Sequence, residues 1–220
     1  PAYKAGLKTG DLIIAVNKKS TMNMELQEVV SEIKKKENKK VVLTIYRDKK
    51  SKDYTVKKSS VQLDTVSYKM KEKKIGYIAV SQFLENTGDQ FDKAVTALEK
   101  KGMKSLIIDL RDNGGGLLNT CTQMVSRVID KDKLIVYTKD KEGNKEEFKS
   151  DSGKTLDIPI IILVNGNTAS ASEIMTGCLK DYGKATVVGT TTYGKGIVQN
   201  IMPLTDGSAI KFTIAKYYTP

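Results

Sequence analysis

The first 58 residues show the hydrophobic pattern of a small, β-rich unit. An apolar run at residues 12–16 follows a turn-rich segment and predicts a short buried strand. Apolar side chains at positions 26, 29, 30 and 33 recur with helical spacing, so we predict one amphipathic helix. Residues 41–46 and 54–56 predict two further strands. We therefore expect residues 1–58 to form a domain of their own.

A polar, lysine-rich stretch separates this unit from the rest of the chain. Residues 59–75 start with two serines and carry lysines throughout positions 69–74, and we interpret them as a linker. Residues 76–220 then alternate between apolar runs of strand length and segments of helical periodicity, which is typical of an α/β domain with helices covering a sheet. We predict strands at residues 76–80, 106–110, 134–138, 146–149, 158–164 and 185–188, and helices at 91–98, 117–128 and 172–182.

The composition removes whole classes of chemistry. None of the 220 residues is a histidine, which excludes histidine-based triads, histidine general bases and histidine-bound zinc. The two cysteines, Cys121 and Cys178, lie far apart and form no Cys-x-x-Cys pattern, so we predict neither a disulfide framework nor a metal site. Catalysis would have to depend on serine, threonine, lysine, tyrosine, cysteine or a carboxylate.

The net charge of +11 comes almost entirely from lysine, because the chain has only three arginines. Readers of nucleic acids usually combine arginine forks with aromatic side chains, so we interpret the charge as solvated surface and predict no nucleic-acid partner. The acidic residues at 130–132 and 140–142 alternate with lysine, which disfavours a calcium loop. The longest apolar run, residues 158–164, is far shorter than a membrane-spanning helix.

One glycine-rich segment, residues 189–196, nearly matches a phosphate-binding P-loop. Gly196 stands where that motif needs a serine or threonine to hold magnesium, and residues 197–201 look extended rather than helical. Both features argue against nucleotide binding.

Two turns rich in small residues could instead stabilise a developing negative charge. Gly114 to Gly116 lie between a predicted strand and a predicted helix, where backbone N–H groups can approach an anion; a simple tight turn is the alternative. Residues 164–173 run from a strand through small residues into a helix. Ser170 and Glu173 fit a capping box there, but capping does not explain the small residues around the Ser170 hydroxyl.

A serine nucleophile needs a base, and here only a lysine that desolvation keeps neutral could serve. Lys195 stands between two glycines beside apolar stretches, with no acidic residue within ten positions on either side. It is the lysine that we expect to act as the base.

Three motifs together resemble the C-terminal processing proteases, also called tail-specific proteases. They are Asp-Leu-Arg-Asp-Asn-Gly-Gly-Gly at 109–116, Thr-Ala-Ser-Ala-Ser-Glu at 168–173 and Tyr-Gly-Lys-Gly-Ile-Val-Gln at 193–199. The intervals of 25 residues from Ser170 to Lys195 and four from Lys195 to Gln199 also match. Residues 1–58 resemble the PDZ domain of these enzymes, and residues 206–209 and 215–220 resemble later strands of the protease core.

The resemblance implies an α/β (α+β) protease core with a crotonase/ClpP-like fold at residues 76–220, preceded by a small β-rich PDZ-like domain at 1–58. It implies a serine endopeptidase in which Ser170 is the nucleophile, Lys195 its general base and Gln199 the residue that positions the lysine. The N–H of Ala171 and that of Gly115 or Gly116 would form the oxyanion hole. No cofactor and no metal are implied. We interpret Ser172 as a helix-start residue.

The same resemblance implies partners and place. The substrates would be unfolded or extended C-terminal tails, captured by strand addition to the PDZ-like domain, and homo-oligomers are an open alternative. Family members act outside the cytoplasm. We expect the PDZ-like domain to be incomplete at its N-terminus, the core to be truncated at Pro220, and a targeting segment to have been removed.

Two other interpretations stay open from the sequence. One is a non-catalytic PDZ scaffold with a degenerate protease core. The other is an acyl-CoA enzyme, because the crotonase fold uses the same paired oxyanion donors; the PDZ-like region and the serine–lysine spacing weigh against it.

Overall fold

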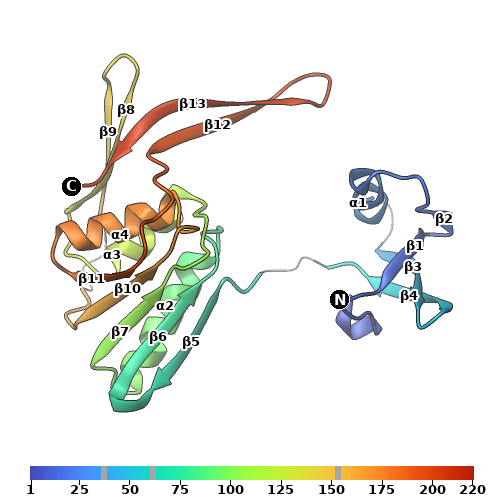
Figure 1. Cartoon of the computed structure of the whole chain (residues 1–220), viewed down its shortest axis with the longest axis horizontal. Helices are drawn as coiled ribbons and strands as arrows, with labels where there is room; N and C mark the ends of the chain where they lie inside the picture. The colour runs from blue at the N-terminus through green and yellow to red at the C-terminus, as the bar shows by residue number, and fades with distance from the viewer. Residues whose placement is uncertain (36–38, 60–62, 152–154) are drawn as a thin grey trace. The chain divides into compact units, whose positions relative to one another are not determined.

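The chain folds into two compact units, Pro1–Gln62 and Leu63–Pro220. The computed structural model describes residues 1–35, 39–59, 63–151 and 155–220 (Figure 1). Each unit has a separate buried apolar cluster, and the two clusters share no residue.

The N-terminal unit is a four-stranded antiparallel sheet with one α-helix; the sequence predicts this helix and three of the strands, but not the two-residue strand β2 Lys19–Ser20. Its strands have the order β2-β1-β3-β4. The bounds are β1 Leu12–Val16, β2 Lys19–Ser20, β3 Lys40–Arg47, β4 Lys50–Lys57, helix α1 Leu26–Lys34 and the short 3₁₀ helix η1 Tyr3–Ala5. Alternate side chains of β1, β3 and β4 form the core: Val16, Val41, Leu43, Ile45 and Val56.

The C-terminal unit is built on a five-stranded sheet of order β11-β10-β7-β6-β5. All neighbouring pairs are parallel except β5 with β6. The strands are β5 Val66–Lys71, β6 Ile75–Val80, β7 Ser105–Asp109, β10 Ile160–Val164 and β11 Ala185–Gly189. The helices are α2 Thr87–Lys100, α3 Leu118–Ser126 and α4 Ala171–Asp181. The predicted α/β alternation is confirmed.

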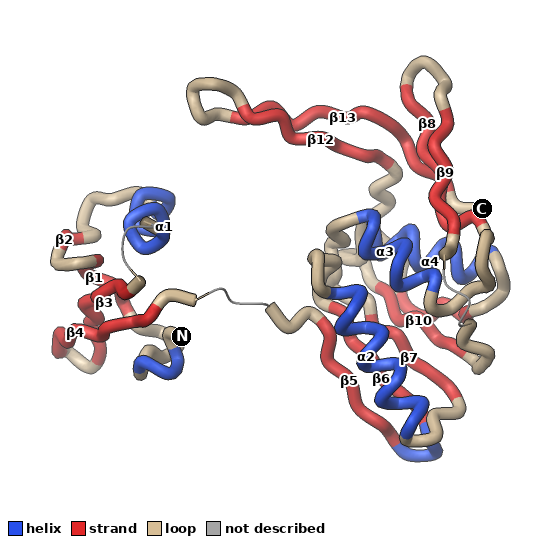
Figure 2. Tube along the Cα trace, turned by 180° about the vertical axis from the view of Figure 1, so that it is seen from behind, coloured by secondary structure: helices blue, strands red, loops and turns tan. Residues whose placement is uncertain are grey.

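Helices cover one face of this sheet. Inward side chains of the central strands, such as Ile78, Ile108 and Ile162, are fully buried in one cluster with residues of α2, α3 and α4. Figure 2 shows α2 lying over the strands β5 and β6. On the opposite face Ile161 and Val188 are 38% and 48% exposed. Among the described residues, no helix combines the length and the apolarity that crossing a bilayer requires.

A second sheet is made of two antiparallel hairpins joined through β13 and β8. Its order is β12-β13-β8-β9, with β8 Leu134–Asp140, β9 Lys145–Lys149, β12 Ile197–Pro203 and β13 Ala209–Tyr218. Both hairpins extend beyond the helices in Figure 1. The hairpin predicted around residues 142–144 and the extended conformation predicted for residues 197–201 are confirmed.

The structure differs from the predicted linker at residues 59–75. Strand β5 lies inside this range and pairs with β6 from Val66–Val80 to Lys71–Ile75, and the 3₁₀ helix η2 Glu72–Lys74 joins them. The outward Lys69 and Lys71 give the segment its polar composition, while Val66 and Met70 pack against the core. Residues 60–62 of the predicted linker lie outside the described residues.

Candidate active site

Ser170 lies at the turn between β10 and α4, in a backbone conformation that a serine rarely adopts. Its φ is 58° and its ψ is −120°, and it precedes the first residue of α4. Positive φ in a non-glycine residue carries a conformational cost and is concentrated at functional sites. The Ser170 N–H donates to the Glu173 carboxylate over 2.8 Å, which is the carboxylate half of the predicted capping box.

The glycine-rich turn packs directly against this serine. A Cβ added at Gly115 would lie 2.7 Å from the Ala169 carbonyl oxygen, 2.8 Å from Ser170 Cβ and 2.9 Å from Ala171 N, and Gly115 has φ +95°. Only glycine satisfies both conditions. The two motifs that the sequence singled out are therefore in contact.

Asn113, fully buried, ties the two turns together. Its backbone carbonyl accepts hydrogen bonds from the Ala169 N–H and from the Ser172 hydroxyl, both over 3.0 Å. Its side-chain amide donates to the Val80 carbonyl, and its side-chain oxygen accepts the Gly115 N–H. Ser172, interpreted from the sequence as a helix-start residue, is thus also a buried link between the turns. The sequence alone did not reveal the role of Asn113, because its partners lie far away in the chain.

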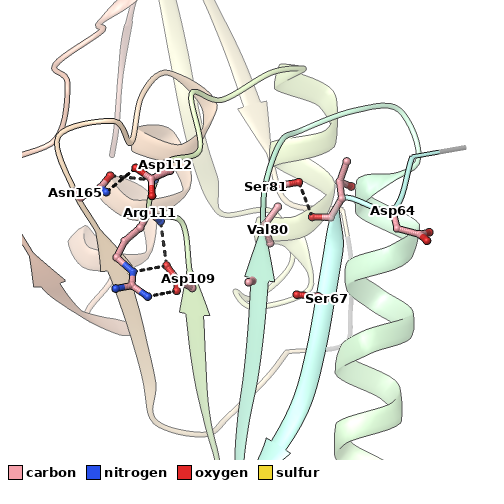
Figure 3. A pocket seen from close by; sticks show the side chains of 10 residues that line it. Asp64, Ser67, Val80, Ser81, Asp109, Arg111, Asp112 and Asn165 are labelled. Carbon is pink, nitrogen blue, oxygen red and sulfur yellow. Dashed lines mark hydrogen bonds and ion pairs between the residues drawn. The ribbon is translucent and has the colours of Figure 1, made fainter. Parts of the chain in front are cut away.

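Asp112 adds a second link at the solvent side of the same turns (Figure 3). Its carboxylate accepts hydrogen bonds from the side-chain amides of Asn165 (2.9 Å) and Asn167 (2.8 Å). The Asp112 N–H donates to the Asn165 side-chain oxygen. These bonds favour the ionised carboxylate, so the pKa of Asp112 is lowered by Asn167 and Asn165.

Asp109 and Arg111 form an ion pair at the end of β7 (Figure 3). Arg111 donates to both carboxylate oxygens, over 2.9 and 2.6 Å, and the Tyr77 hydroxyl donates over 2.6 Å. Burial raises the pKa of Asp109, but the hydrogen bonds from Arg111 and Tyr77 outweigh it and hold the pKa at about 2. This pair anchors the start of the glycine-rich turn.

Two backbone N–H groups beside Ser170 are free to bind an anion. Within the described part of the chain, the N–H groups of Gly116 and Ala171 donate no hydrogen bond. Gly115 differs, because its N–H is held by Asn113. The backbone of Gly116 packs tightly against the backbone of Phe83. A Cβ at Gly116 would lie 2.1 Å from the Phe83 carbonyl oxygen.

Glu173 joins the serine turn to the segment that carries Lys195. One carboxylate oxygen accepts the Ser170 and Lys195 N–H groups, over 2.8 and 2.9 Å. The other accepts the Thr192 hydroxyl and the Gly194 N–H, both over 2.7 Å. A carboxylate has about four lone-pair sites, so all of them are in use. The sequence showed only the capping role of Glu173.

Tyr217, on β13, contacts the backbone carbonyls of the same two residues. Its hydroxyl donates to the Lys195 carbonyl, and the Ser170 carbonyl is 3.4 Å away. The side chain is half-buried, and burial together with the negative charge of Glu173 raises the pKa of Tyr217. The sequence singled out this residue only as part of a motif at 215–220.

One cavity of about 310 Å³ brings most of the predicted site residues together. Ser170, Lys195, Gln199, Ala171 and Gly116 all line it. Apolar side chains supply much of the remaining wall: Leu117, Leu118, Ile174, Ile197, Val198 and Ile201. Among the described residues, no hydrogen bond joins the side chains of Ser170, Lys195 and Gln199.

The two cysteines are buried thiols in the helices α3 and α4. Cys121 is buried, which raises the pKa of its thiol, and its S–H donates to the Ala171 carbonyl over 3.2 Å. In the described ranges, no group of three or more cysteine, aspartate or glutamate side chains is placed to hold a metal ion.

The chain is similar to known peptidases over its whole length. The family model described as "Peptidase family S41" matches residues 74–220, and the one described as "PDZ domain" matches residues 1–47. A probable CtpA-like serine protease of Staphylococcus aureus (strain N315) is 41% identical over 222 residues. The carboxy-terminal processing protease CtpA of Bacillus subtilis (strain 168) is 40% identical over 220 residues.

The alignments cover the whole of this chain but only part of each relative, and a solved structure shows the same relationship. The alignments cover 100% of this chain but only 45% and 47% of those two relatives, so the chain spans about half their length. The solved structure of a photosystem II D1 C-terminal processing protease matches with a TM-score of 0.64 at 28% identity, covering 100% of this chain and 61% of that one.

Proposed function

The chain belongs to peptidase family S41, and from this premise we propose that it is a serine endopeptidase that cleaves polypeptides near their C-termini with a Ser170–Lys195 dyad. The observation that carries the proposal is the convergence on one cavity: Ser170, Lys195 and Gly116 line it together. The chain's lack of histidine leaves a lysine as the natural base.

The reaction is acyl transfer. The Ser170 hydroxyl attacks a peptide carbonyl carbon while the neutral Lys195 amine takes its proton. The lysine then passes this proton to the leaving amine, and the C–N bond breaks. Water, deprotonated by the same amine, releases the acyl group from Ser170. Gln199 lines the cavity beside Lys195 and would orient its amine. The Lys195 side chain must come within about 3.2 Å of the Ser170 hydroxyl for the first transfer.

The oxyanion of the tetrahedral intermediate would be held by the N–H groups of Ala171 and Gly116. Both are free of other hydrogen bonds within the described residues and both line the cavity. The N–H of Gly115 donates to Asn113, so we assign Gly115 the role of spacer under Ser170. Two such donors contribute several kcal/mol, about 3–4 for each, when they are aimed at the developing charge.

Substrate tails would first bind the N-terminal unit. Its match to a PDZ domain supports recognition of extended C-terminal segments by strand addition. The apolar wall of the site cavity suits uncharged side chains next to the cleaved bond. We also assign the protein an extracytoplasmic place of action, on its resemblance to enzymes that act there.

The test is the removal of each dyad member. Ser170→Ala and Lys195→Ala should each lower kcat by at least about 10³-fold on a loosely folded protein substrate. Lys180→Ala, on the exposed end of α4, and Ser67→Ala, on β5, are the matched controls and should keep full activity. Activity within a few-fold of wild type in either dyad variant would refute the assignment.

The same variants separate the other two interpretations. A serine-reactive phosphonate should label Ser170 in the wild type and not in Lys195→Ala. A non-catalytic scaffold would show no labelling of the wild type. An acyl-CoA enzyme would bind acyl-CoA tightly and leave polypeptides intact.

A further inference from the structure

The backbones of Ser170 and Lys195 are held in the same way from two sides. The Glu173 carboxylate accepts the N–H of both residues, over 2.8 and 2.9 Å. The Tyr217 hydroxyl contacts the carbonyls of both, donating to Lys195 with Ser170 at 3.4 Å. The two holding groups come from different elements, α4 and β13.

Such a clamp fixes the direction of the lysine side chain. The Lys195 N–H belongs to the peptide plane before its Cα, and its carbonyl belongs to the plane after it. Holding both planes fixes the two soft backbone dihedrals of this residue. The Cα–Cβ bond then points in one direction, and only the side-chain torsions remain for the amine to reach Ser170.

The Tyr217 hydroxyl is the only part of this side chain that the proposed positioning of Lys195 requires. Main-chain hydrogen bonds already attach strand β13 to the segment that follows Lys195. The Tyr217 N–H donates to the Gly196 carbonyl over 3.1 Å, and Lys216 pairs with Ile197. The phenol adds one donor directly at residue 195. Tyr217 is also one of the residues that line the site cavity.

We propose that Tyr217 is a positioning residue for the Ser170–Lys195 pair, acting through its hydroxyl on the Lys195 carbonyl in opposition to Glu173. This inference rests on the proposed dyad function. Tyr217 does not touch the reacting atoms in this role; it sets the geometry of the base.

The experiment compares Tyr217→Phe, which removes one oxygen, with Tyr217→Leu, which also removes the ring. The control is Tyr218→Phe, whose ring stacks on Tyr137 in the second sheet. Each variant is assayed for kcat and KM on a peptide substrate and for the rate of Ser170 labelling by a phosphonate. The labelled fraction gives the number of competent sites, so kcat is expressed per site whatever fraction folds.

The expected result is that Tyr217→Phe lowers kcat per site by about 10- to 100-fold with KM changed less than twofold, as a misplaced base should. The labelling rate should fall by the same factor, Tyr217→Leu should be at least as slow, and Tyr218→Phe should match the wild type. Wild-type kcat per site in Tyr217→Phe would overturn the clamp and leave the dyad standing. Full activity in Lys195→Ala would overturn the dyad and the clamp with it.

Discussion

At the residue scale, Asp109 shows how a buried charge can stabilise a turn that the site needs. Burial works against its ionised form, and Arg111 and Tyr77 outweigh burial, so its pKa is about 2 instead of the ordinary 3.8. A carboxylate whose pKa is lower in the folded than in the unfolded chain stabilises the fold above the unfolded pKa. The contribution is about 2 kcal/mol at neutral pH, and it is lost as the pH falls from about 4 toward 2.

Asp109→Asn should remove this pH dependence. Between pH 5 and pH 2, the free energy of unfolding of the wild type should fall by about 2 kcal/mol more than that of Asp109→Asn, because the amide cannot be protonated in this range. Tyr77→Phe keeps Arg111 and should lie between the two. Urea unfolding at a series of pH values measures the slopes, and parallel slopes for all three proteins would contradict the assignment.

The residues that line the candidate site were predictable where a motif carried them; their catalytic roles stay predictions. Ser170, Lys195 and the glycines stand out by their neighbours, and the structure places them around one cavity or, for Gly115, directly under Ser170. The second role of Glu173 and the role of Asn113 were not predictable, because their partners lie many positions away and no local pattern encodes them. Asn113 and Ser172, for example, are 59 positions apart.

At the element scale, the sequence predicted the helices and most strands and missed the short β2 and the longer β5. The lysines at the outward positions of β5 give the segment a polar composition, which we interpreted as a linker. Val66, Tyr68 and Met70 nevertheless alternate with polar residues at the two-residue period of a strand. An edge strand with charged outward residues is easily mistaken for a linker. The pairing with β6 is a tertiary contact that local composition does not reveal.

The turn between β7 and α3 offers a matched pair of glycines. Gly115→Ala should destabilise the C-terminal unit by about 2–4 kcal/mol, from a strained φ and a Cβ placed 2.7 Å from the Ala169 carbonyl. A Cβ at Gly114 meets no atom within 4 Å, so Gly114→Ala should change stability by less than about 1 kcal/mol.

Urea unfolding and kcat measure both variants. Gly115→Ala should also lower kcat, since its new methyl group displaces Ser170 and Ala171, while Gly114→Ala stays near the wild type. Equal effects of the two substitutions would contradict the close packing of the two turns.

At the scale of the whole molecule, the two units have separate cores and should unfold separately. Among the residues that the structure describes, the N-terminal core has five buried apolar side chains. A unit of this size buries a smaller fraction of its surface than a larger domain does and is marginally stable by itself, so it should melt first. The sequence predicted both units, because the pattern changes from isolated strands to α/β alternation near the boundary.

A matched pair of conservative changes tests this independence. Ile45 in β3 and Ile108 in β7 are 1% and 0% exposed, and Ile→Val at either site should cost about 1 kcal/mol. Ile45→Val should lower only the first thermal transition, by about 4–8 °C, and Ile108→Val only the second, by about 2–4 °C. Calorimetry resolves the two, and a single transition that shifts with both variants would contradict separate folding.

The hydrogen bonds of Glu173 also show how a structural acid can be told from a catalytic one. Glu173 stands three positions after the proposed nucleophile, as close as a third catalytic residue would be. A search for catalytic groups by distance alone would therefore score it as a proton acceptor. Both its oxygens already receive two donors each. Counting vacant acceptor sites, rather than measuring nearness, separates acids that can take up a proton during turnover from those that only brace a scaffold.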